Sequence, residues 1–317
     1  MSAPLHVPAE TGPHAACWMA WPYREDEWVD LAGARAEIAA FARAIAETEP
    51  VELLVAPGVQ APALGEGVRV RRMAYGDAWT RDTGAIFGWR DEEPVALVFR
   101  FDGWGGKYRM AGDEDLAERI AAALDVRVER HALVLEGGGV ELDGAGALMT
   151  TRDCLERRNP GVDVTARLEA AFGVERVIWL EGQLENDHTD GHIDTLARFL
   201  RPGEAVAMAP VDGDPNGETL RRLLGQLEAA GLKVHALPSP GAVVGAEGTL
   251  LPASYCNYYL ANGQVLVPTY GVDADAEAVE ALAALYPERR VRGLGARKIL
   301  EGGGAFHCIT QQQPARP

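Results

Sequence analysis

The sequence of 317 residues has few cysteines and keeps them far apart. The four are Cys17, Cys154, Cys256 and Cys308, and no two of them form a Cys-x-x-Cys pair. This spacing argues against a disulfide framework and against a zinc ribbon or zinc finger. We therefore expect four reduced cysteines, one of which can be reactive.

Long apolar runs and basic stretches are also missing. No segment approaches the roughly eighteen consecutive apolar residues of a membrane span, and residues 1–10 contain no basic region followed by an apolar run. The formal charge of −17 is spread along the chain, which disfavours nucleic acid or an anionic membrane as a partner. We expect a cytoplasmic protein whose charge is compatible with a cationic ligand.

Glycine-rich runs are present, but the dinucleotide-binding pattern is not. Glu136 and Glu301 each precede three consecutive glycines. A dinucleotide-binding site would need Gly-x-Gly-x-x-Gly at the start of a helix, and neither run fits that pattern. Glycines here instead allow a ligand or a neighbouring strand to approach the backbone closely.

A helix followed by a strand recurs five times along the chain. The apolar spacing predicts helices over residues 31–46, 113–124, 163–172, 218–230 and 275–285. β-like runs follow them at residues 51–55, 126–128, 176–180, 233–237 and 291–294.

Five glycines, each introducing an apolar run that we interpret as a strand, recur in step with these helices every 53 to 57 residues. They are Gly84, Gly137, Gly191, Gly248 and Gly302. Each module leaves a sheet edge and face that only a neighbour can cover, so the repeat predicts five α/β modules closed around an axis. The expected fold is a five-bladed pseudo-symmetric α/β propeller, with residues 1–317 as a single domain. An ordinary doubly wound sheet is the alternative.

His192 and Asp194 lie in a short run after Gly191, which we interpret as a strand. Side chains alternate between the two faces of a strand, so this imidazole and this carboxylate are expected to share one surface. A structural, hydrogen-bonded core histidine is the alternative for His192.

Cys308 ends the segment Gly-Gly-Gly-Ala-Phe-His-Cys. Strand alternation would put His307 and Cys308 on opposite faces, so we expect the group that activates the thiol to come from another module. Cys17, Cys154 and Cys256 are interpreted as small buried apolar residues, which is the commonest state of a free cysteine.

Asp82 belongs to an Arg-Asp pair that is flanked by Trp79 and Gly84. Trp79 could cover the face of an alkyl-guanidinium group, or it could belong to the core. Residues 187–194 are rich in metal-ligand types, but His188 and His192 would share a face only on a helix, and Gly191 argues against one. We therefore expect no catalytic metal.

At these residues the chain resembles the agmatine deiminases, which belong to the guanidine-modifying superfamily together with bacterial-type peptidylarginine deiminases. The resemblance covers nearly the whole chain. It rests on Trp21-Pro22, Trp79-Thr-Arg-Asp-Thr-Gly, Leu135-Glu-Gly-Gly-Gly, Thr189-Asp-Gly-His-Ile-Asp, Ser254-Tyr-Cys-Asn-Tyr-Tyr-Leu-Ala-Asn-Gly and Gly302-Gly-Gly-Ala-Phe-His-Cys-Ile-Thr-Gln-Gln. It implies a five-bladed α/β propeller of the pentein type, often a homodimer, with no metal or organic cofactor.

The resemblance also implies a reaction, namely hydrolysis of agmatine to N-carbamoylputrescine and ammonia through a covalent S-alkylthiouronium. It places the nucleophile at Cys308, the general acid and base at His192, and the carboxylates that hold the guanidinium at Asp82, Asp194 and Glu136.

For the distal amine of such a substrate we expect an acidic residue of the loop before His192, either Glu185, Asp187 or Asp190. Three other functions stay open. They are a peptidylarginine or other arginine-derivative deiminase with the same catalytic set, an amidinotransferase, and a ligand-binding propeller without activity. The last would not need a thiol together with an acid and base.

Overall fold

Five sheets of three or four strands make up the β-structure of residues 4–316, the part of the chain that this computed structural model describes. The two four-stranded sheets have the orders β1 (Leu5–His6), β5 (Ile86–Arg90), β6 (Glu93–Arg100), β7 (Arg127–Val134), and β17 (Gln311–Pro314), β2 (His14–Ala20), β3 (Val51–Val55), β4 (Val68–Arg72). Two of the three-stranded sheets have the orders β10 (Arg176–Leu180), β9 (Ala147–Thr151), β8 (Val140–Leu142), and β11 (Ala197–Arg201), β12 (Glu204–Ala209), β13 (Lys233–Pro238). The third has the order β14 (Tyr259–Ala261), β15 (Gln264–Thr269), β16 (Arg290–Gly295).

All five sheets share one pairing pattern. In each sheet a middle strand has one antiparallel neighbour and, on its other side, pairs parallel with the strand that follows it in sequence, as β12 does with β11 and β13. The other middle strands are β6, β9, β15 and β2. In the last sheet β17, from the end of the chain, pairs with β2, from its beginning. The repeat that the sequence predicts is therefore present as five α/β units.

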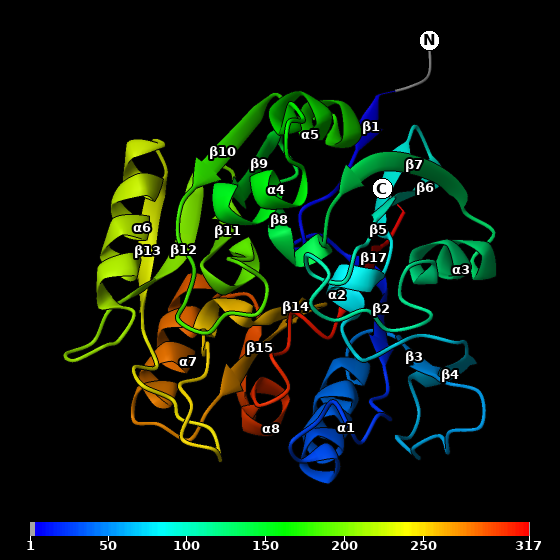
Figure 1. The fold of residues 1–317 in the computed structure, drawn as a ribbon, viewed down its shortest axis with the longest axis horizontal. Helices are drawn as coiled ribbons and strands as arrows, with labels where there is room; N and C mark the ends of the chain where they lie inside the picture. Colours follow the sequence, from blue (N-terminus) through cyan, green and yellow to red (C-terminus); the bar gives the residue numbers. More distant parts are fainter. Residues whose placement is uncertain (1–3, 317) are drawn as a thin grey trace.

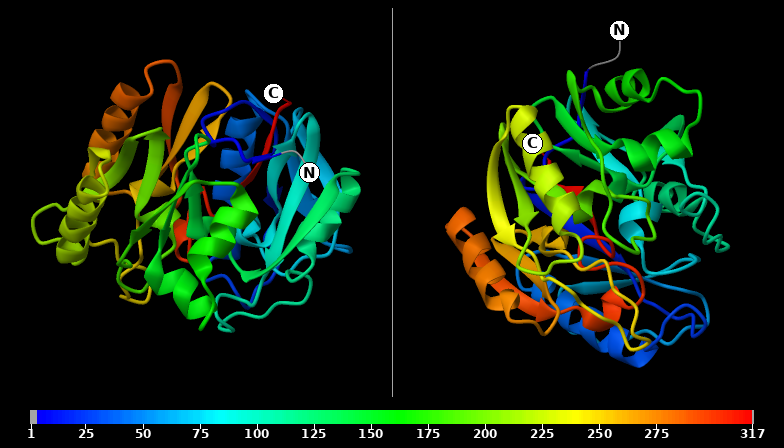
Figure 2. Two further views of the ribbon diagram at one scale, coloured as in Figure 1. Left: turned by 90° about the horizontal axis from the view of Figure 1, so that it is seen from above. Right: turned by 60° about the vertical axis from the view of Figure 1, so that its left-hand side comes forward.

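The predicted helices form the crossovers between the parallel strands, as parallel pairing requires. They are α1 (Leu31–Ala46), α3 (Leu116–Ala123), α5 (Val164–Phe172), α6 (Gly217–Ala229) and α7 (Ala274–Leu285). Figure 1 shows these helices around the rim, and both views of Figure 2 show α6 and α7 outside their strands. The shorter helices are α2 (Thr80–Thr83), α4 (Arg152–Arg158), α8 (Arg297–Leu300) and the 3-10 helices η1 (Gly137–Gly139), η2 (Ile193–Thr195) and η3 (Tyr255–Asn257).

Local chemistry sets the ends of these helices. α1 begins after Asp30, whose Oδ1 accepts from the N–H of Gly33 at 2.8 Å. α5 begins in the same way after Asp163, and it ends at Gly173, which has a φ of 68° in the left-handed region. Apolar residues at helical spacing give α1 one buried face.

The repeated glycine introduces a strand as expected at Gly84, which one residue separates from β5, but not at Gly137, Gly191 or Gly248, where a short 3-10 helix contains or follows the glycine before the strand begins. η2, for example, lies between Gly191 and β11. His192 and Asp194 thus belong to a 3-10 helix and its N-terminal boundary, not to a strand. A three-residue helix has too few residues to show a period in the sequence, which is why the pattern did not reveal it.

Buried charge joins several sheets near the middle of the molecule. Arg198 on β11 is fully buried, and its Nε donates to Oε2 of Glu141 on β8 at 3.0 Å. Its Nη2 donates to Oε2 of Glu10 at 2.8 Å, and its Nη1 donates to the carbonyl of Tyr258, just before β14, at 2.9 Å. Each charge has a partner of opposite sign, as burial requires.

Within residues 4–316, no helix has both the length and the apolar character that crossing a lipid bilayer demands.

Candidate active site

Four short segments, each just before a strand, carry the predicted side chains of the candidate site. Asp82 lies in α2, and Glu136 directly precedes η1. His192 directly precedes η2, which contains Asp194. Cys308 lies in the turn at residues 306–309, before β17. Residues that are far apart in the sequence are thereby delivered to one region.

Gly138, the middle glycine of the first triple-glycine run, is the point where three of these side chains meet. A Cβ atom on Gly138 would lie 2.7 Å from Nδ1 of His192, 2.9 Å from Oδ1 of Asp82 and 3.1 Å from Oδ2 of Asp194. The N–H of Gly138 also donates to Oδ1 of Asp82 at 2.9 Å. The absence of a side chain at Gly138 therefore allows the imidazole and both carboxylates to converge.

Asp82 is buried between a tryptophan and the imidazole. Its Oδ2 accepts from Nε1 of Trp104 at 2.8 Å, and its Oδ1 lies 3.6 Å from Nδ1 of His192. Burial raises the pKa of Asp82, His192 lowers it, and the nearby Asp194 raises it further, with a net increase. A cationic group between these carboxylates would favour their charged forms.

His192 is held by its backbone and by carboxylates on two sides. Its N–H donates to Oγ1 of Thr189 at 3.0 Å, and its Nε2 lies 3.5 Å from Oε2 of Glu136. Burial alone lowers the pKa of His192, but Asp82 and Glu136 outweigh burial, so this pKa lies well above its usual value. A ring that keeps its proton at neutral pH can donate it to a leaving group.

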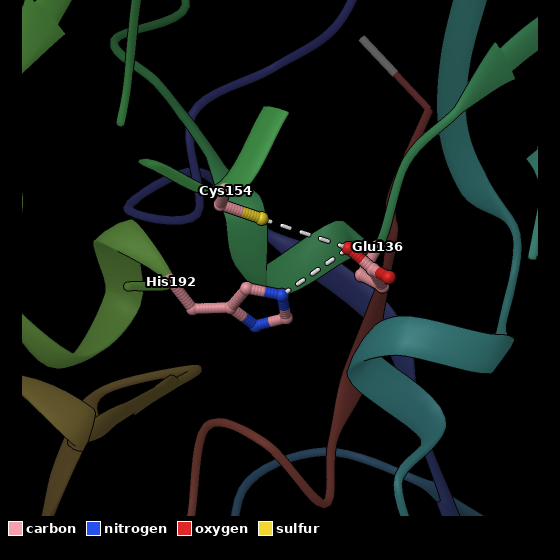
Figure 3. A group of neighbouring side chains, drawn as sticks. All are labelled: Glu136, Cys154 and His192. Carbon is pink, nitrogen blue, oxygen red and sulfur yellow. Dashed lines mark hydrogen bonds and ion pairs between the residues drawn. The ribbon is translucent and has the colours of Figure 1, made fainter. Parts of the chain in front are cut away.

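Glu136 lies beside His192 and is fully buried. Its Oε1 accepts from Nε of Arg158 at 2.9 Å, while its Oε2 faces His192 and lies 3.7 Å from Sγ of Cys154 (Figure 3). Burial raises the pKa of Glu136, but His192 and Arg158 outweigh burial and hold it below its usual value. The carboxylate therefore stays charged beside the ring.

Asp194 is fixed through one carboxylate oxygen. Its Oδ2 lies 2.7 Å from Nδ1 of His307, whose Nε2 lies 2.8 Å from Oε2 of Glu10. Burial raises the pKa of Asp194, but its hydrogen bond to His307 outweighs burial and holds this pKa below its usual value. Its Oδ1 is buried and has no hydrogen-bond partner among the described residues, so it can accept from a substrate.

Cys308 contacts an amide and a carboxylate. Nδ2 of Asn257, in η3, donates to its Sγ at 3.2 Å, and its Sγ lies 3.7 Å from Oδ2 of Asp194. His307 and Cys308 thus both reach Asp194, and they do not face opposite sides as a strand would require. The chain turns here, with the N–H of Thr310 donating to the carbonyl of His307 at 3.1 Å.

The thiol of Cys308 is not activated by its resting surroundings. Burial raises its pKa well above the usual value, and the carboxylates of Asp194 and Asp82 raise it further. The thiolate is the nucleophilic form of cysteine, so attack requires a positive charge to be brought close to these carboxylates.

A cavity of about 150 Å³ leads to Cys308 and Asp82. Trp79 and Trp104 contribute aromatic walls. Trp79 also stacks on Trp28, with ring centroids 5.4 Å apart and planes at 11°, so it belongs to both the core and the cavity wall. Trp79 therefore belongs to the core, and its contact with a guanidinium group stays a prediction.

The loop acids predicted from the sequence do not line this cavity. Glu185 is exposed. Asp187 accepts from the N–H groups of Thr189 and Gly191 at 2.9 and 2.8 Å, so it stabilises the turn that precedes His192. The third acid, Asp190, is held by three cations, Lys107, Arg157 and Arg158. Short polar loops often use their carboxylates in this way to satisfy backbone N–H groups.

Other acidic residues line the cavity, namely Glu27, Asp77 and Glu301. Asp77 accepts from Nε1 of Trp28 at 3.0 Å, and burial raises its pKa to about 6. Asp77 is therefore charged in most molecules at neutral pH.

Sequence reasoning gave no role to Asn257, Trp104, His307 or Glu10. Asn257 lies in the motif Ser-Tyr-Cys-Asn, and both it and Asp194 belong to a 3-10 helix just before the first strand of a sheet. Trp104 lies among glycines in a loop and has a φ of 53°, which is unusual for a bulky residue and not visible in a sequence.

Residues 6–314 match the protein family described as Porphyromonas-type peptidyl-arginine deiminase. The agmatine deiminase of Pseudomonas aeruginosa (strain LESB58) is 37% identical over 357 aligned residues, covering 98% of this chain and 96% of that protein.

Solved structures of agmatine deiminases are also similar to this chain over nearly its whole length. The agmatine deiminase of Enterococcus faecalis, described as catalysing its reaction, is similar with a TM-score of 0.92 at 29% identity, covering 100% of this chain and 99% of that one. An agmatine deiminase of C. jejuni with substrate bound has a TM-score of 0.90 at 25% identity, covering 98% of this chain and 97% of that one. The α/β fold of the chain is therefore the fold of these enzymes.

Proposed function

Because the chain belongs to the family of Porphyromonas-type peptidyl-arginine deiminases, we propose that it hydrolyses the guanidinium group of agmatine to N-carbamoylputrescine and ammonia. The observation that carries this proposal is the convergence of His192, Asp82 and Asp194 on Gly138, with the sulfur of Cys308 beside Asp194. These groups supply a nucleophile, a proton donor and two acceptors for one planar cation.

Binding positions the guanidinium carbon. Asp82 and Asp194 accept hydrogen bonds from its N–H groups and hold its plane, and Trp79 covers the alkyl chain. The bound cation offsets the two carboxylates that raise the pKa of Cys308, so the substrate itself favours the thiolate. Orienting the carbon against the sulfur supplies part of the rate enhancement.

Attack and hydrolysis then follow in two steps. The sulfur of Cys308 forms a bond to the guanidinium carbon, His192 gives its proton to the leaving nitrogen, and ammonia departs. The remaining S-alkylthiouronium is attacked by water, which loses a proton to His192. Breaking the carbon–sulfur bond yields the ureido product and restores the thiol.

Glu136 takes a positioning role in this scheme. Its two oxygens already contact Nε2 of His192 and the guanidinium of Arg158, so it is not assigned direct contact with the substrate. Asp190 supports the same arrangement, because it accepts from Nη1 of Arg158 at 2.7 Å.

The principal experiment measures ammonia release from agmatine, free arginine, a blocked arginine peptide and methylated arginines. We expect the highest kcat/KM for agmatine and a fall to background in Cys308→Ser. Cys17→Ser, which changes a buried thiol of the core, is the control and should keep its activity. Preference for the blocked peptide would favour the peptidylarginine alternative. Equal ammonia release by Cys308→Ser would show that Cys308 is not the nucleophile.

For the distal amine we propose Asp77 and Glu27, in place of the loop acids. Both line the cavity that leads to Cys308, and a carboxylate there can pair with an ammonium group. Asp77→Asn should raise the KM for agmatine by about tenfold, the loss of one charge-assisted hydrogen bond, and should change little for butylguanidine, which lacks the amine.

Glu185→Gln is the matched control for the distal amine, because Glu185 is exposed and lies outside the cavity. Its KM for agmatine should stay within about twofold of the unchanged protein. A larger rise in the KM for agmatine in Glu185→Gln than in Asp77→Asn would show that the distal amine binds at the loop before His192.

Three features of the whole chain belong to the same proposal. The shared pairing pattern of the five sheets and the pairing of β17 with β2 support a five-bladed pseudo-symmetric propeller. Residues 1–317 would then act as one catalytic domain. Assembly as a homodimer and a location in the cytoplasm stay predictions.

A further inference from the structure

We propose that Glu136, Cys154 and His192 form a site for a divalent ion of the zinc class, and that occupancy of this site inhibits the enzyme. Among the described residues, this is the group whose three donor atoms all lie within 4.8 Å of one another. Figure 3 shows the three side chains pointing toward one another from three separate elements.

The spacing of the donor atoms fits one ion. Oε2 of Glu136 lies 3.5 Å from Nε2 of His192 and 3.7 Å from Sγ of Cys154. Zinc binds sulfur at about 2.3 Å and nitrogen or oxygen at about 2.0–2.2 Å, so donors around a tetrahedral zinc are about 3.5 Å apart. The donor atoms of Cys154 and His192 lie within 4.8 Å of each other, so closure by at most about 1.3 Å would bring the third pair to the same spacing.

The rest of the structure holds these donors in place. Arg158 occupies Oε1 of Glu136 at 2.9 Å, which leaves Oε2 turned toward the other two donors. Cys154 is fixed on α4 and is fully buried. A Cβ atom on Gly139 would lie 3.8 Å from Sγ of Cys154, so the space next to the thiol is the size of a methyl group.

Charge and donor type select the ion. Coordination requires the thiol of Cys154 to lose its proton and Nε2 of His192 to be free of one. A doubly charged ion that displaces one proton from each leaves the net charge of this buried region unchanged. A thiolate, an imidazole and a carboxylate suit zinc or cobalt, whereas magnesium and calcium prefer oxygen donors alone.

Occupancy would stop the proposed reaction. An ion on Nε2 of His192 fixes the ring and removes its capacity to exchange a proton, and it draws Glu136 away from its positioning role. The effect on turnover rests on the proposed function. Binding itself can be measured without turnover, so the two can fail separately.

The test of binding uses cobalt(II), because a cobalt–thiolate bond gives a charge-transfer absorption that reports the sulfur directly. The titrated protein is Cys308→Ser, in which the ion cannot bind the sulfur beside Asp194. We expect the absorption in Cys308→Ser and in Cys308→Ser with Cys256→Ser, and its loss in Cys308→Ser with Cys154→Ser. Cys256 is the matched control because it is also fully buried.

Affinity for zinc gives a second measurement on the otherwise unchanged chain. Competition with a chromophoric chelator should show binding at least about tenfold weaker in Cys154→Ser than in the unchanged protein or in Cys256→Ser. If Cys154→Ser unfolds at a lower temperature than the assay, Cys154→Ala replaces it. No cobalt–thiolate absorption, or absorption that survives loss of Cys154, would overturn the site.

Inhibition is tested on turnover of each protein relative to its own activity without metal. Zinc should inhibit the unchanged protein and Cys256→Ser, a chelator should restore them, and Cys154→Ser should resist. Equal inhibition of all three would place the inhibitory ion elsewhere and overturn the regulatory part of the proposal.

Discussion

Gly138 carries no side chain at the point where His192, Asp82 and Asp194 approach one another most closely. Gly138→Ala would place a methyl carbon 2.7 Å from Nδ1 of His192, a distance that forces the ring or the carboxylates to move. We expect a fall in kcat of about 100-fold, because a misplacement of about 1 Å in a catalytic site costs that much. Steady-state kinetics of ammonia release measures it.

The neighbouring glycine provides the control. A Cβ on Gly139 would meet its nearest atoms at 3.8 Å, which is ordinary van der Waals contact, so Gly139→Ala should keep most of its activity. Both variants should unfold at similar temperatures. Equal kcat values in Gly138→Ala and Gly139→Ala would show that the convergence over Gly138 does not matter for turnover.

At this scale the sequence predicted which residue types meet, but not how each one is oriented. The family resemblance, more than spacing, predicted that His192, Asp194, Asp82 and Cys308 share a region. It also placed Glu136 among the carboxylates that hold the guanidinium, yet the side chain of Glu136 turns toward His192 and Arg158. The orientation of the Glu136 side chain depends on the backbone of η1 and on Arg158, 22 residues away. Neither can be predicted from the residues next to Glu136.

At the scale of elements, periodicity predicted the long helices and missed the short ones. α1 begins and ends at the predicted residues, because its sixteen residues show several turns of apolar spacing. The other crossover helices agree within three residues at either end. η1, η2 and η3 have three residues each, less than one turn of an α-helix, so they leave no period to detect.

The approach to α3 contains a buried carboxylate with a consequence for stability. Oδ1 of Asp113 accepts from the N–H of Gly76 at 2.8 Å, whereas its Oδ2 is buried without a partner among the described residues. Burial, together with the neighbouring charges of Asp77 and Glu114, raises the pKa of Asp113 to about 7. The folded protein therefore resists ionisation of this group.

The sign of the pH dependence follows from that raised pKa. The stabilising contribution of protonated Asp113 is present below its unfolded pKa and is lost as pH rises through about 7. Asp113→Asn keeps an acceptor for Gly76 and cannot ionise. It should raise the free energy of unfolding at pH 8 by about 2 to 4 kcal/mol, because a tenfold change in proton binding corresponds to about 1.4 kcal/mol.

Urea unfolding at pH 5 and pH 8 measures this effect, and the gain should be about half as large or less at pH 5, where the carboxyl is already ionised in the unfolded chain but still protonated in the folded one. Asp115→Asn is the control, since Asp115 lies exposed in a surface pair with Arg119 and should change stability by about 1 kcal/mol or less at either pH. A gain for Asp113→Asn that is equal at both pH values would show that its ionisation does not govern stability.

At the scale of the whole molecule, the repeated spacing predicted five units, while the contacts between units could not be predicted. Those contacts include charges that sequence reasoning left aside. Glu10, near the start of the chain, contacts His307, near its end, and also contacts Arg198 from a central unit. Residues separated by hundreds of positions carry no local pattern that pairs them, and only the packing of the folded chain brings them together.

Arg198 is the buried cation that pairs with Glu10 and Glu141. Arg198→Met keeps much of the volume of the side chain but leaves Glu10 and Glu141 buried without their shared partner. We expect the free energy of unfolding to fall by about 3 to 5 kcal/mol, because removing one partner strands buried charge. Arg201 lies on the same strand, with 58% of its side chain exposed and its Nε 3.8 Å from Glu204, so Arg201→Met should cost about 1 kcal/mol or less. Urea unfolding at neutral pH compares the two, and equal losses would mean that the buried network adds nothing beyond a surface pair.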